Sequence, residues 1–452
     1  MEHSLYLQVL AEELTPTNRN SISLRVTVPT LLKKIIYFQG PNLLLVWLLD
    51  RKNEIWNSIF VSFDNTIRIA GTISISRMHE EMTQSSQLSA NLPVLDMLAR
   101  SVRTAFTRPN KLSFSFRTAC NVVKQPDAKV FIACKIPQPG IDELKAAGIS
   151  YDLRDEVQSC TAEQLQEHVR GKGYTGLLVT LNDRVDDALL DAAGPQLKVV
   201  STMSVGFDHL TRPALAKRGI IAGNTPEVLT ETTAELCFAL LLATSRRIPE
   251  AVNAVKDAEW GSWVPLWMCG QDLWGSTVGI VGMGRIGKSF ARRMKGFVLK
   301  EMLYSDPFRL SPEEEKELGL KYVSMDEVLE KSDFVVPHCP LLPETTGLFN
   351  AAAFKKMKKT CVFINTTRGP VVDQDALVDA LKTGEIWGAG LDVTVPEPLP
   401  PSHPLVSLPN CVVLPHIASA TVQTRGKMSE LAGKNMVAGL TGKPMPTPIK
   451  LE

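Results

Sequence analysis

The stretch TVGIVGMGRIGKSFARRM, residues 277–294, decides the fold of this chain. Its first five residues form an apolar run typical of a buried strand, and the stretch KSFARRMK, residues 288–295, is predicted to form a helix. Between them lies a GxGxxG pattern. Gly282 permits a tight turn, Gly284 lets the backbone approach a pyrophosphate, and Gly287 packs the helix against the strand. Because the helix start then presents free N–H groups to phosphates, the stretch predicts a Rossmann-like dinucleotide site.

A carboxylate, Asp306, ends the next predicted strand, which lies in EMLYSDP at residues 301–307. Asp306 lies 19 residues after Gly287, where a carboxylate can accept hydrogen bonds from both ribose hydroxyls. A negative charge there repels the 2′-phosphate of NADP, so the sequence favours NAD(H). NADP(H) remains possible, because Arg309 is close enough to pair with a 2′-phosphate and because Asp306 could simply form a turn.

Strands and helices alternate along the chain from Lys129 onward. KVFIAC, GLLVTL and LKVVSTMSVG are predicted to be strands, IDELKAAG a helix, and residues 225–256 one long helix. A second alternating series begins at residue 276. Since such alternation predicts parallel sheets, we expect two α/β domains with a cleft between them.

The bulk composition excludes several classes of protein. With 452 residues, 44% of them hydrophobic, the chain can form two or three domains with cores. Its 49 basic and 48 acidic residues leave a formal charge of +1, so no global field favours nucleic acid or an anionic membrane. The longest clean apolar run, residues 43–49, is shorter than the roughly 20 residues of a membrane-spanning helix. The eight cysteines include no CxxC pair, so neither a metal site nor a disulfide framework is expected.

The first 126 residues differ from the rest. Residues 1–96 form an unassigned segment whose short apolar runs between 22 and 76 predict an antiparallel β meander. Residues 97–126 contain no Asp or Glu, and their composition is typical of either a transit peptide or a basic linker. We expect a cytoplasmic protein, with mitochondrial import as the alternative if the natural chain starts near Met97.

Three residues after the glycine pattern suit the reduction of a 2-oxo acid. Arg368 follows the predicted strand CVFINTT, and its planar, permanent charge can bind a carboxylate. His416 ends the predicted strand CVVLPH, and a histidine beside a carboxylate such as Glu397 can act as a proton donor. Each residue alone has an ordinary structural alternative, and His338 at the end of another strand is the nearest rival acid. Together with the glycine pattern, the three predict hydride transfer.

From about Lys129 the chain resembles the D-isomer-specific 2-hydroxyacid dehydrogenases. The resemblance rests on STMSVGFDHL, LTETTAEL, SWVPLWMCG, VGMGRIG, INTTRG, LDVTVPEPLP and LPHIASAT, and these motifs are most similar to the glyoxylate reductase/hydroxypyruvate reductase branch. It implies two Rossmann-like, doubly wound parallel-sheet domains. A discontinuous substrate-binding domain would comprise residues 127–227 and 417–452, and an NAD(P)-binding domain residues 228–416. It also implies a homodimer joined through the cofactor domains.

The resemblance also implies an activity and roles for residues. The activity is NAD(P)H-dependent reduction of glyoxylate to glycolate and of hydroxypyruvate to D-glycerate, with the preferred substrate left open. Arg368 would anchor the carboxylate and carbonyl, His416 would donate the proton, and Glu397 would keep His416 protonated. The other implied substrate-binding residues are Val205 and Gly206 through their N–H groups, Ser419 beside the histidine, and Trp263, which either crosses a dimer interface or only packs there. The implied cofactor-binding residues are Thr233, Gly282, Gly284, Arg285, Ile286, Gly287, Asp306, Pro340, Thr366 and Asp392.

Some positions depart from the pattern of the branch. Ala418 stands where glycine is usual, and Asp306 stands where the mammalian-type enzymes favour a residue compatible with NADPH. The first 126 residues match nothing in the family. The alternative function is an NAD(H)-sensing, corepressor-like scaffold, because such relatives can keep the three residues. Formate dehydrogenase is disfavoured because it has glutamine in place of Glu397. Phosphoglycerate dehydrogenase with a regulatory domain is disfavoured because only 36 residues follow His416.

Overall fold

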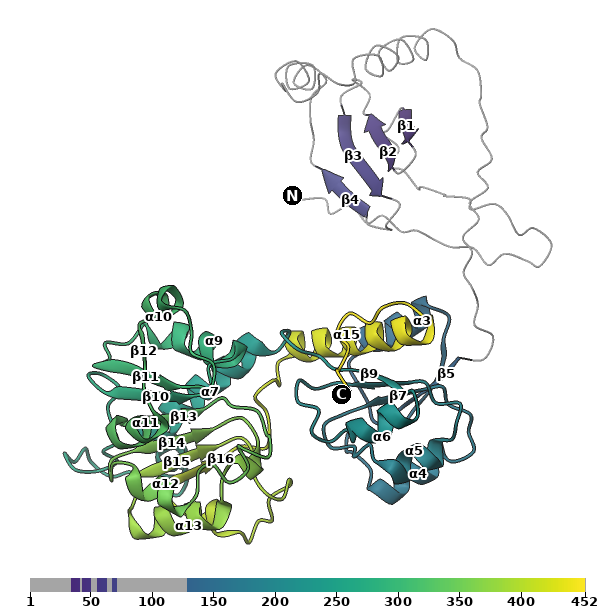
Figure 1. The fold of residues 1–452 in the computed structure, drawn as a ribbon. Coiled ribbons are helices and arrows are strands. Elements are labelled where there is room, and N and C mark those ends of the chain that lie inside the picture. Colours follow the sequence, from purple (N-terminus) through teal and green to yellow (C-terminus); the bar gives the residue numbers. More distant parts are fainter. Residues whose placement is uncertain (1–33, 41–42, 50–54, 63–66, 71–127, 452) are drawn as a thin grey trace, which may run out of the picture. The chain divides into compact units, whose positions relative to one another are not determined.

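The computed structural model describes residues 34–40, 43–49, 55–62, 67–70 and 128–451, and the chain divides into two units, 1–123 and 124–452. In the first unit, four strands form an antiparallel sheet in the order β1-β2-β3-β4 (Figure 1). These strands are β1 (Lys34–Gly40), β2 (Leu43–Leu49), β3 (Ile55–Ser62) and β4 (Ile67–Ala70). They lie in the segment where an antiparallel meander was predicted. The basic segment 97–126 lies outside the described residues.

The second unit begins with a five-stranded parallel sheet in the order β6-β5-β7-β8-β9. Helices α3 and α15 cover one face, and α4, α5 and α6 cover the other (Figure 1). Every residue of β7 and β8 is buried, as expected for strands covered on both faces. The strands are β5 (Lys129–Ile132), β6 (Ser150–Leu153), β7 (Gly176–Val179), β8 (Val199–Thr202) and β9 (Ile221–Gly223). The helices are α3 (Gln138–Ala146), α4 (Ala162–Val169), α5 (Asp187–Ala193), α6 (Arg212–Lys217) and α15 (Val422–Leu440).

A seven-stranded parallel sheet follows, in the order β12-β11-β10-β13-β14-β15-β16. Its order reverses between β10 and β13, and ligands of such sheets bind at the carboxyl ends of the strands beside this reversal. Two separate buried clusters fill the two faces of the sheet. The strands are β10 (Thr277–Val281), β11 (Glu301–Ser305), β12 (Leu320–Tyr322), β13 (Phe334–Pro337), β14 (Val362–Asn365), β15 (Gly388–Leu391) and β16 (Cys411–Val413).

The helices of the seven-stranded unit lie on both faces of its sheet. Helices α7 and α9 pack with the cluster on one face, and α11, α12 and α13 pack with the cluster on the other. Serine side chains cap α10 and α11, where Ser311 and Ser324 each form a capping box with a glutamate three residues on. The helices are α7 (Thr230–Ser245), α8 (Ile248–Lys256), α9 (Arg285–Met294), α10 (Pro312–Leu318), α11 (Met325–Lys331), α12 (Ala351–Lys356), α13 (Gln374–Thr383) and α14 (Pro404–Ser407).

The single helix predicted for residues 225–256 is wrong. The structure contains two helices, α7 and α8, separated at Arg247, whose φ is 53°. Pro249 follows in the first turn of α8. A proline removes a backbone donor and collides with the preceding turn when it lies inside a helix, so it fits only a new helix start.

Helix α15 returns the chain to the five-stranded sheet. It packs closely on α3, because a Cβ on Gly433 would lie 2.7 Å from the carbonyl oxygen of Gly140. Asn435 fixes the following segment, since its Nδ2 donates to the carbonyl of Asn224 at 2.9 Å and to Oγ1 of Thr447 at 2.8 Å. The expected fold class, with two parallel-sheet α/β domains and a discontinuous first domain, is therefore confirmed.

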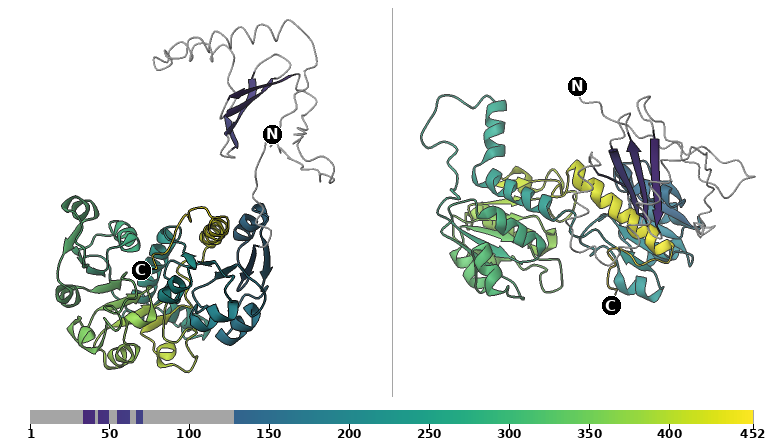
Figure 2. Two further views of the ribbon diagram at one scale, coloured as in Figure 1. Left: turned by 45° about the vertical axis from the view of Figure 1, so that its right-hand side comes forward. Right: turned by 90° about the horizontal axis from the view of Figure 1, so that it is seen from above.

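An arm formed by α8 and residues 257–275 stands away from the seven-stranded sheet (Figure 2). It carries exposed apolar side chains, including Trp263 at 83% and Leu266 at 89% exposure. Within the part of the chain that the structure describes, no helix has both the length and the apolar composition to cross a membrane.

Candidate active site

The glycine turn after β10 has the shape of a dinucleotide cradle. Gly282 has a φ of 96°, and a Cβ there would lie 2.6 Å from the backbone nitrogen of Cys339. A Cβ on Gly287 would lie 2.5 Å from the carbonyl oxygen of Gly282. Any larger residue at position 287 would therefore keep helix α9 from approaching β10 as closely as it does. At Gly284, by contrast, a Cβ would meet no atom within 4 Å. The first and third glycines therefore serve packing, and the second borders open space.

Helix α9 begins at this open space without a side-chain cap. Gly284 is its N-cap residue, and the first turn starts with Arg285 and Ile286. Because the first N–H groups of a helix have no partner inside the helix, they can donate to an anion. The turn and the uncapped helix start together fit the pyrophosphate of a dinucleotide.

Asp306 lies beside this turn, immediately after β11. Its Oδ2 accepts a hydrogen bond from the N–H of Met283 at 2.6 Å, and its Oδ1 accepts one from the N–H of Phe308 at 2.7 Å. Asp306 therefore forms the local turn and also places a carboxylate next to the cradle. Arg309 is paired with Glu315, with 2.8 Å from Nε to Oε1 and 3.0 Å from Nη2 to Oε2. Arg309 and Tyr304 together lower the pKa of Glu315 to about 2, so this partner stays ionised.

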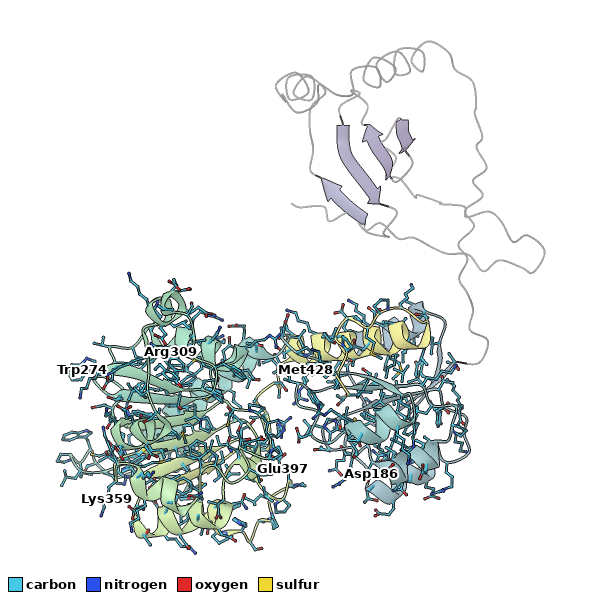
Figure 3. The ribbon with its side chains drawn as sticks, in the orientation of Figure 1. Asp186, Trp274, Arg309, Lys359, Glu397 and Met428 are labelled. Carbon is cyan, nitrogen blue, oxygen red and sulfur yellow. The ribbon has the colours of Figure 1, made fainter. Side chains whose placement is uncertain are left out.

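His416 and Glu397 form a hydrogen-bonded pair. Nδ1 of His416 lies 2.8 Å from Oε2 of Glu397, and the two side chains are 22% and 28% exposed. Glu397, labelled in Figure 3, also accepts a hydrogen bond on Oε1 from the N–H of Thr394 at 3.0 Å. Burial raises the pKa of Glu397. The hydrogen bond and charge of His416 lower it more, helped by the N–H of Thr394 and the charge of Arg368, so the pKa of Glu397 is lowered overall. Since a carboxylate only accepts, Nδ1 carries the proton and Nε2 is the ring nitrogen available to a substrate.

A loop, rather than a strand, holds His416. Strand β16 ends at Val413, so the prediction that His416 ends this strand is wrong. His416 has a left-handed φ of 54°, and its N–H donates to the carbonyl of Asp392 at 2.9 Å. The side chain of Asp392 accepts from the N–H groups of Ile417 and Ala418, both at 2.8 Å. Asp392 therefore fixes the loop that carries the histidine.

Arg368 follows β14 and meets the loop after β8. Its Nε donates to Oδ1 of Asp208 at 3.1 Å, and its Nη1 donates to the carbonyl of Thr367 at 3.0 Å. Its Nη2 lies against Gly206, where a Cβ would come within 1.9 Å of it. Only glycine at position 206 allows the guanidinium to lie there.

In the loop that faces Arg368, two carbonyl groups accept hydrogen bonds from polar side chains. Oγ of Ser204 donates to the carbonyl of Gly206, and Nδ2 of Asn224 donates to the carbonyl of Val205, both at 2.7 Å. Among the described residues, no acceptor is recorded for the N–H groups of Val205 and Gly206. These two N–H groups and the guanidinium can together bind a carboxylate. Sequence reasoning gave no role to Ser204, Asp208 or Asn224, although the first two lie inside a motif that it quoted.

The remaining predicted site residues lie in three settings. Thr233, Thr366 and Ser419 are buried, in the first turn of α7, in the loop after β14 and in the loop after His416, respectively. Pro340 lies in the loop after β13, three residues beyond its end. Trp263 lies on the exposed arm, and its side chain is 83% exposed.

His338 differs from His416 in its surroundings. It is buried against the ring of Phe290, with 5.1 Å between ring centroids, and burial lowers its pKa to about 3. A histidine that stays neutral is a poor proton donor at neutral pH, so the rival assignment loses its support.

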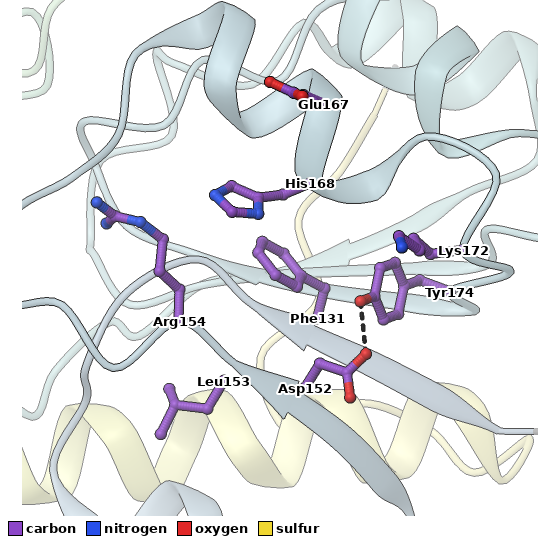
Figure 4. A pocket seen from close by; sticks show the side chains of 8 residues that line it. All are labelled: Phe131, Asp152, Leu153, Arg154, Glu167, His168, Lys172 and Tyr174. Carbon is purple, nitrogen blue, oxygen red and sulfur yellow. Dashed lines mark hydrogen bonds between the residues drawn. The ribbon is translucent and has the colours of Figure 1, made fainter.

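A separate hollow of about 580 Å³ lies at the edge of the five-stranded sheet (Figure 4). Its carboxylate Asp152 already accepts from the hydroxyl of Tyr174 at 2.6 Å and pairs with Lys129 at 2.6 Å. None of the predicted site residues lines it. Within the described residues, no group of three or more His, Cys, Asp or Glu side chains could hold a metal ion.

The doubly wound sheet, the glycine cradle, Arg368 and the His416–Glu397 pair, whose carboxylate feels the charge of Arg368, define an NAD(P)-dependent dehydrogenase. The chain belongs to the D-isomer-specific 2-hydroxyacid dehydrogenase family. Residues 238–418 match the family model described as "D-isomer specific 2-hydroxyacid dehydrogenase, NAD binding domain". The resemblance noted in the sequence is thereby confirmed.

Two kinds of relatives support this membership. The chain is 52% identical over 324 residues to the glyoxylate reductase/hydroxypyruvate reductase of Homo sapiens. The aligned region covers 72% of this chain and 98% of the human protein. Among solved structures, the TT0316 protein from Thermus thermophilus is 41% identical, with a TM-score of 0.66 and coverage of 71% of this chain and all of that one. The NADPH-dependent glyoxylate/hydroxypyruvate reductase of Sinorhizobium meliloti, in complex with NADP and malonate, is 33% identical, with a TM-score of 0.63 and coverage of 72% and 97%.

Proposed function

We propose that this protein reduces glyoxylate to glycolate and hydroxypyruvate to D-glycerate. The observation that carries the proposal is the pairing of His416 with Glu397 in a chain whose Arg368 lies against Gly206, in the loop where no acceptor is found among the described residues for the N–H groups of Val205 and Gly206. These groups match the two needs of a 2-oxo acid, which are a cationic carboxylate site and a proton donor for the carbonyl oxygen. The names of the human and Sinorhizobium relatives favour the same two substrates.

Three groups of atoms bind and protonate the substrate. Nη2 of Arg368 and the N–H groups of Val205 and Gly206 bind the substrate carboxylate. Nε2 of His416 donates its proton to the carbonyl oxygen, and Glu397 stabilises the charged ring and its orientation through Nδ1. A bound nicotinamide dinucleotide would supply the hydrogen and the electron pair that reduce the carbonyl carbon. Residues 127–227 with 417–452 serve as the substrate-binding domain, and residues 228–416 as the cofactor domain.

The glycine cradle and Asp306 would hold the cofactor, together with the other residues assigned to it. We propose NAD(H) as the preferred form, because the Asp306 carboxylate lies beside the cradle while the nearby cation Arg309 is already paired with Glu315. A 2′-phosphate would meet the negative charge of Asp306 and would have to compete for Arg309. The Sinorhizobium relative is NADPH-dependent, so NADP(H) is the alternative to test.

We also propose a homodimer that covers the arm. Trp260, Trp263 and Leu266 are exposed at 64%, 83% and 89%, and monomeric proteins rarely leave such a cluster uncovered. Trp263 would reach the active site of the partner. For the cell compartment we keep the cytoplasm, with mitochondria as the alternative if the natural chain begins near Met97. N-terminal sequencing of the natural protein distinguishes the two.

Turnover by the purified protein tests the proposed reaction. Oxidation of NADH and NADPH would be followed by absorbance with glyoxylate, hydroxypyruvate and pyruvate, and the product would be identified by chromatography. Turnover of the first two acids is the expected result. Activity confined to another acid would contradict the substrate assignment, and absence of turnover with any acid would revive the scaffold alternative, which the reductase names of the relatives disfavour.

A further inference from the structure

Asp208 and Arg368 lie in different α/β domains and contact each other. It follows β8 of the five-stranded sheet, whereas Arg368 follows β14 of the seven-stranded sheet, and 160 residues separate them in the chain. Nε of Arg368 donates to Oδ1 of Asp208 at 3.1 Å, and the side chains are 23% and 36% exposed. The pair therefore joins two loops that belong to different sheets.

The three guanidinium nitrogens have different surroundings. Nε is held by Asp208, and Nη1 donates to the carbonyl of Thr367 at 3.0 Å. For Nη2, no acceptor is recorded among the described residues, and this nitrogen lies against Gly206. Because a guanidinium is planar, fixing Nε and Nη1 also fixes the direction of Nη2. The ion pair thus leaves free the nitrogen that lies against Gly206.

The loop that carries Asp208 is itself held in place. Oγ of Ser204 donates to the carbonyl of Gly206 at 2.7 Å, and Thr202 Oγ1 lies 2.9 Å from Nε2 of His209, the next residue after Asp208. A carboxylate on such a loop can hold an arginine in one orientation. A mobile surface carboxylate could not, and most exposed ion pairs contribute little to stability.

We propose that Asp208 is a positioning residue for Arg368. Asp208, in the five-stranded domain, fixes the guanidinium of Arg368, in the seven-stranded domain, through Nε. As a result, Nη2 and the N–H groups of Val205 and Gly206 converge on the carboxylate of a 2-oxo acid. This inference rests on the proposed function and adds to it a residue that does not touch the substrate. The carboxylate site then depends on the relative position of the five-stranded and seven-stranded domains.

The test compares Asp208→Ala with Asp208→Asn. Alanine removes the acceptor, whereas asparagine keeps an oxygen that can accept from Nε but loses the charge. Asp187→Ala is the matched control, because it breaks an ion pair of 2.7 Å with Arg218 elsewhere in the five-stranded unit. Each variant would be assayed for KM and kcat with hydroxypyruvate, for affinity towards oxamate at saturating NADH, and for affinity towards NADH alone.

The inference predicts a loss confined to the carboxylate site. In Asp208→Ala, KM and the dissociation constant of oxamate should rise about tenfold or more, as for loss of one charge-assisted positioning contact. Asp208→Asn should recover most of that loss, while NADH affinity and the control variant stay near wild type. Unchanged oxamate affinity in Asp208→Ala would overturn the inference. Equal losses in oxamate and NADH affinity would also overturn it, because they indicate general damage to the fold.

A second readout does not depend on turnover. The Nε–H resonance of Arg368, assigned by its absence in Arg368→Lys, should exchange slowly with solvent in the wild type and rapidly in Asp208→Ala. If the wild type reduces no 2-oxo acid, the proposed function fails, and this resonance still decides whether Asp208 holds Arg368. Should Asp208→Ala not fold, Asp208→Ser takes its place, because its shorter side chain also removes the carboxylate that accepts from Nε. Similar exchange rates in wild type and variant would contradict the inference.

Discussion

Oε2 of Glu397 lies 2.8 Å from Nδ1 of His416, although the two residues are 19 positions apart in the chain. The other carboxylate oxygen accepts from the N–H of Thr394 at 3.0 Å, so Glu397 cannot turn away without losing a second hydrogen bond. The carbonyl of Asp392 holds the backbone of His416 at 2.9 Å. The ring is therefore fixed from two sides, with Nε2 left for a substrate.

Replacement of His416 by Asn should remove the proton donor. We expect kcat to fall by about 10² to 10⁴, the usual contribution of general acid catalysis, while NADH affinity changes little. Steady-state kinetics and a fluorescence titration with NADH measure the two effects. Near-normal turnover would refute the role of His416.

Replacement of Glu397 by Gln tests the effect of the pair on pH dependence. The pKa of Glu397 is lowered in the folded protein, so the stability that it contributes is fully present above its ordinary pKa of 4.5 and is lost as pH falls through the lowered pKa. The wild type should therefore have the higher Tm near pH 6, and the difference should vanish in acid. A Tm difference that is constant with pH would argue against the pair.

A methyl group on Gly206 should displace Arg368. Its Cβ would lie 1.9 Å from Nη2, and the loop cannot retreat easily because Ser204 and Asn224 hold it. We expect Gly206→Ala to raise KM for the 2-oxo acid at least tenfold, as expected when a charged hydrogen-bonding group is misplaced. Gly296→Ala is the control, since its Cβ would meet only one atom, at 3.5 Å. Equal kinetics in the two variants would show that Arg368 adapts.

Replacement of Asp306 by Ala should change the choice of cofactor. The variant loses the acceptor beside the cradle and also the charge that repels a 2′-phosphate, so KM for NADH should rise much more than KM for NADPH. The ratio of the two kcat/KM values measures this directly. Equal effects on both cofactors would remove Asp306 from the ribose site.

Trp263 and Trp274 offer a matched pair for the dimer. Both are exposed in the single chain, at 83% and 74%. If Trp263 enters the active site of the partner, Trp263→Ala should raise KM for hydroxypyruvate, and Trp274→Ala should not. Sedimentation or light scattering would report the oligomeric state of each variant. A monomeric wild type with full activity would contradict the proposal.

The sequence predicted the features that local spacing determines. Gly282, Gly284 and Gly287 could be assigned because a tight turn and a close helix impose short-range demands on residue type. The strand before Arg368 could be found because buried parallel strands are continuously apolar, and every residue of β14 is buried. The strand before His416 was found from a similar apolar run, although the residues of β16 are only half-buried. Residues 225–256 were misjudged because their helical composition masked a break at Arg247 that only Pro249 hinted at.

The pairings across the chain could not be predicted in the same way. Asp208 and Arg368 are 160 residues apart, and their contact depends on how two loops from different sheets meet. The hydrogen-bonded carbonyls of the 204–208 loop depend on Asn224, which lies on another loop and carries no motif. The sequence predicted Arg368, Glu397 and His416, but not Asp208 or Asn224, because their contacts depend on how distant loops fold together.

The return of α15 to the first sheet has a consequence for biosynthesis. Strand β9 ends at Gly223 and α15 ends at Leu440, so about 200 residues must be added before the sheet face that α3 covers in part also receives α15, roughly 10–40 s of translation. The seven-stranded sheet is complete earlier, with β16 at Val413. A nascent chain can therefore finish its glycine cradle while the face of the five-stranded sheet that α3 and α15 share is covered by α3 alone. During that interval the ribosome-bound chain needs protection from aggregation.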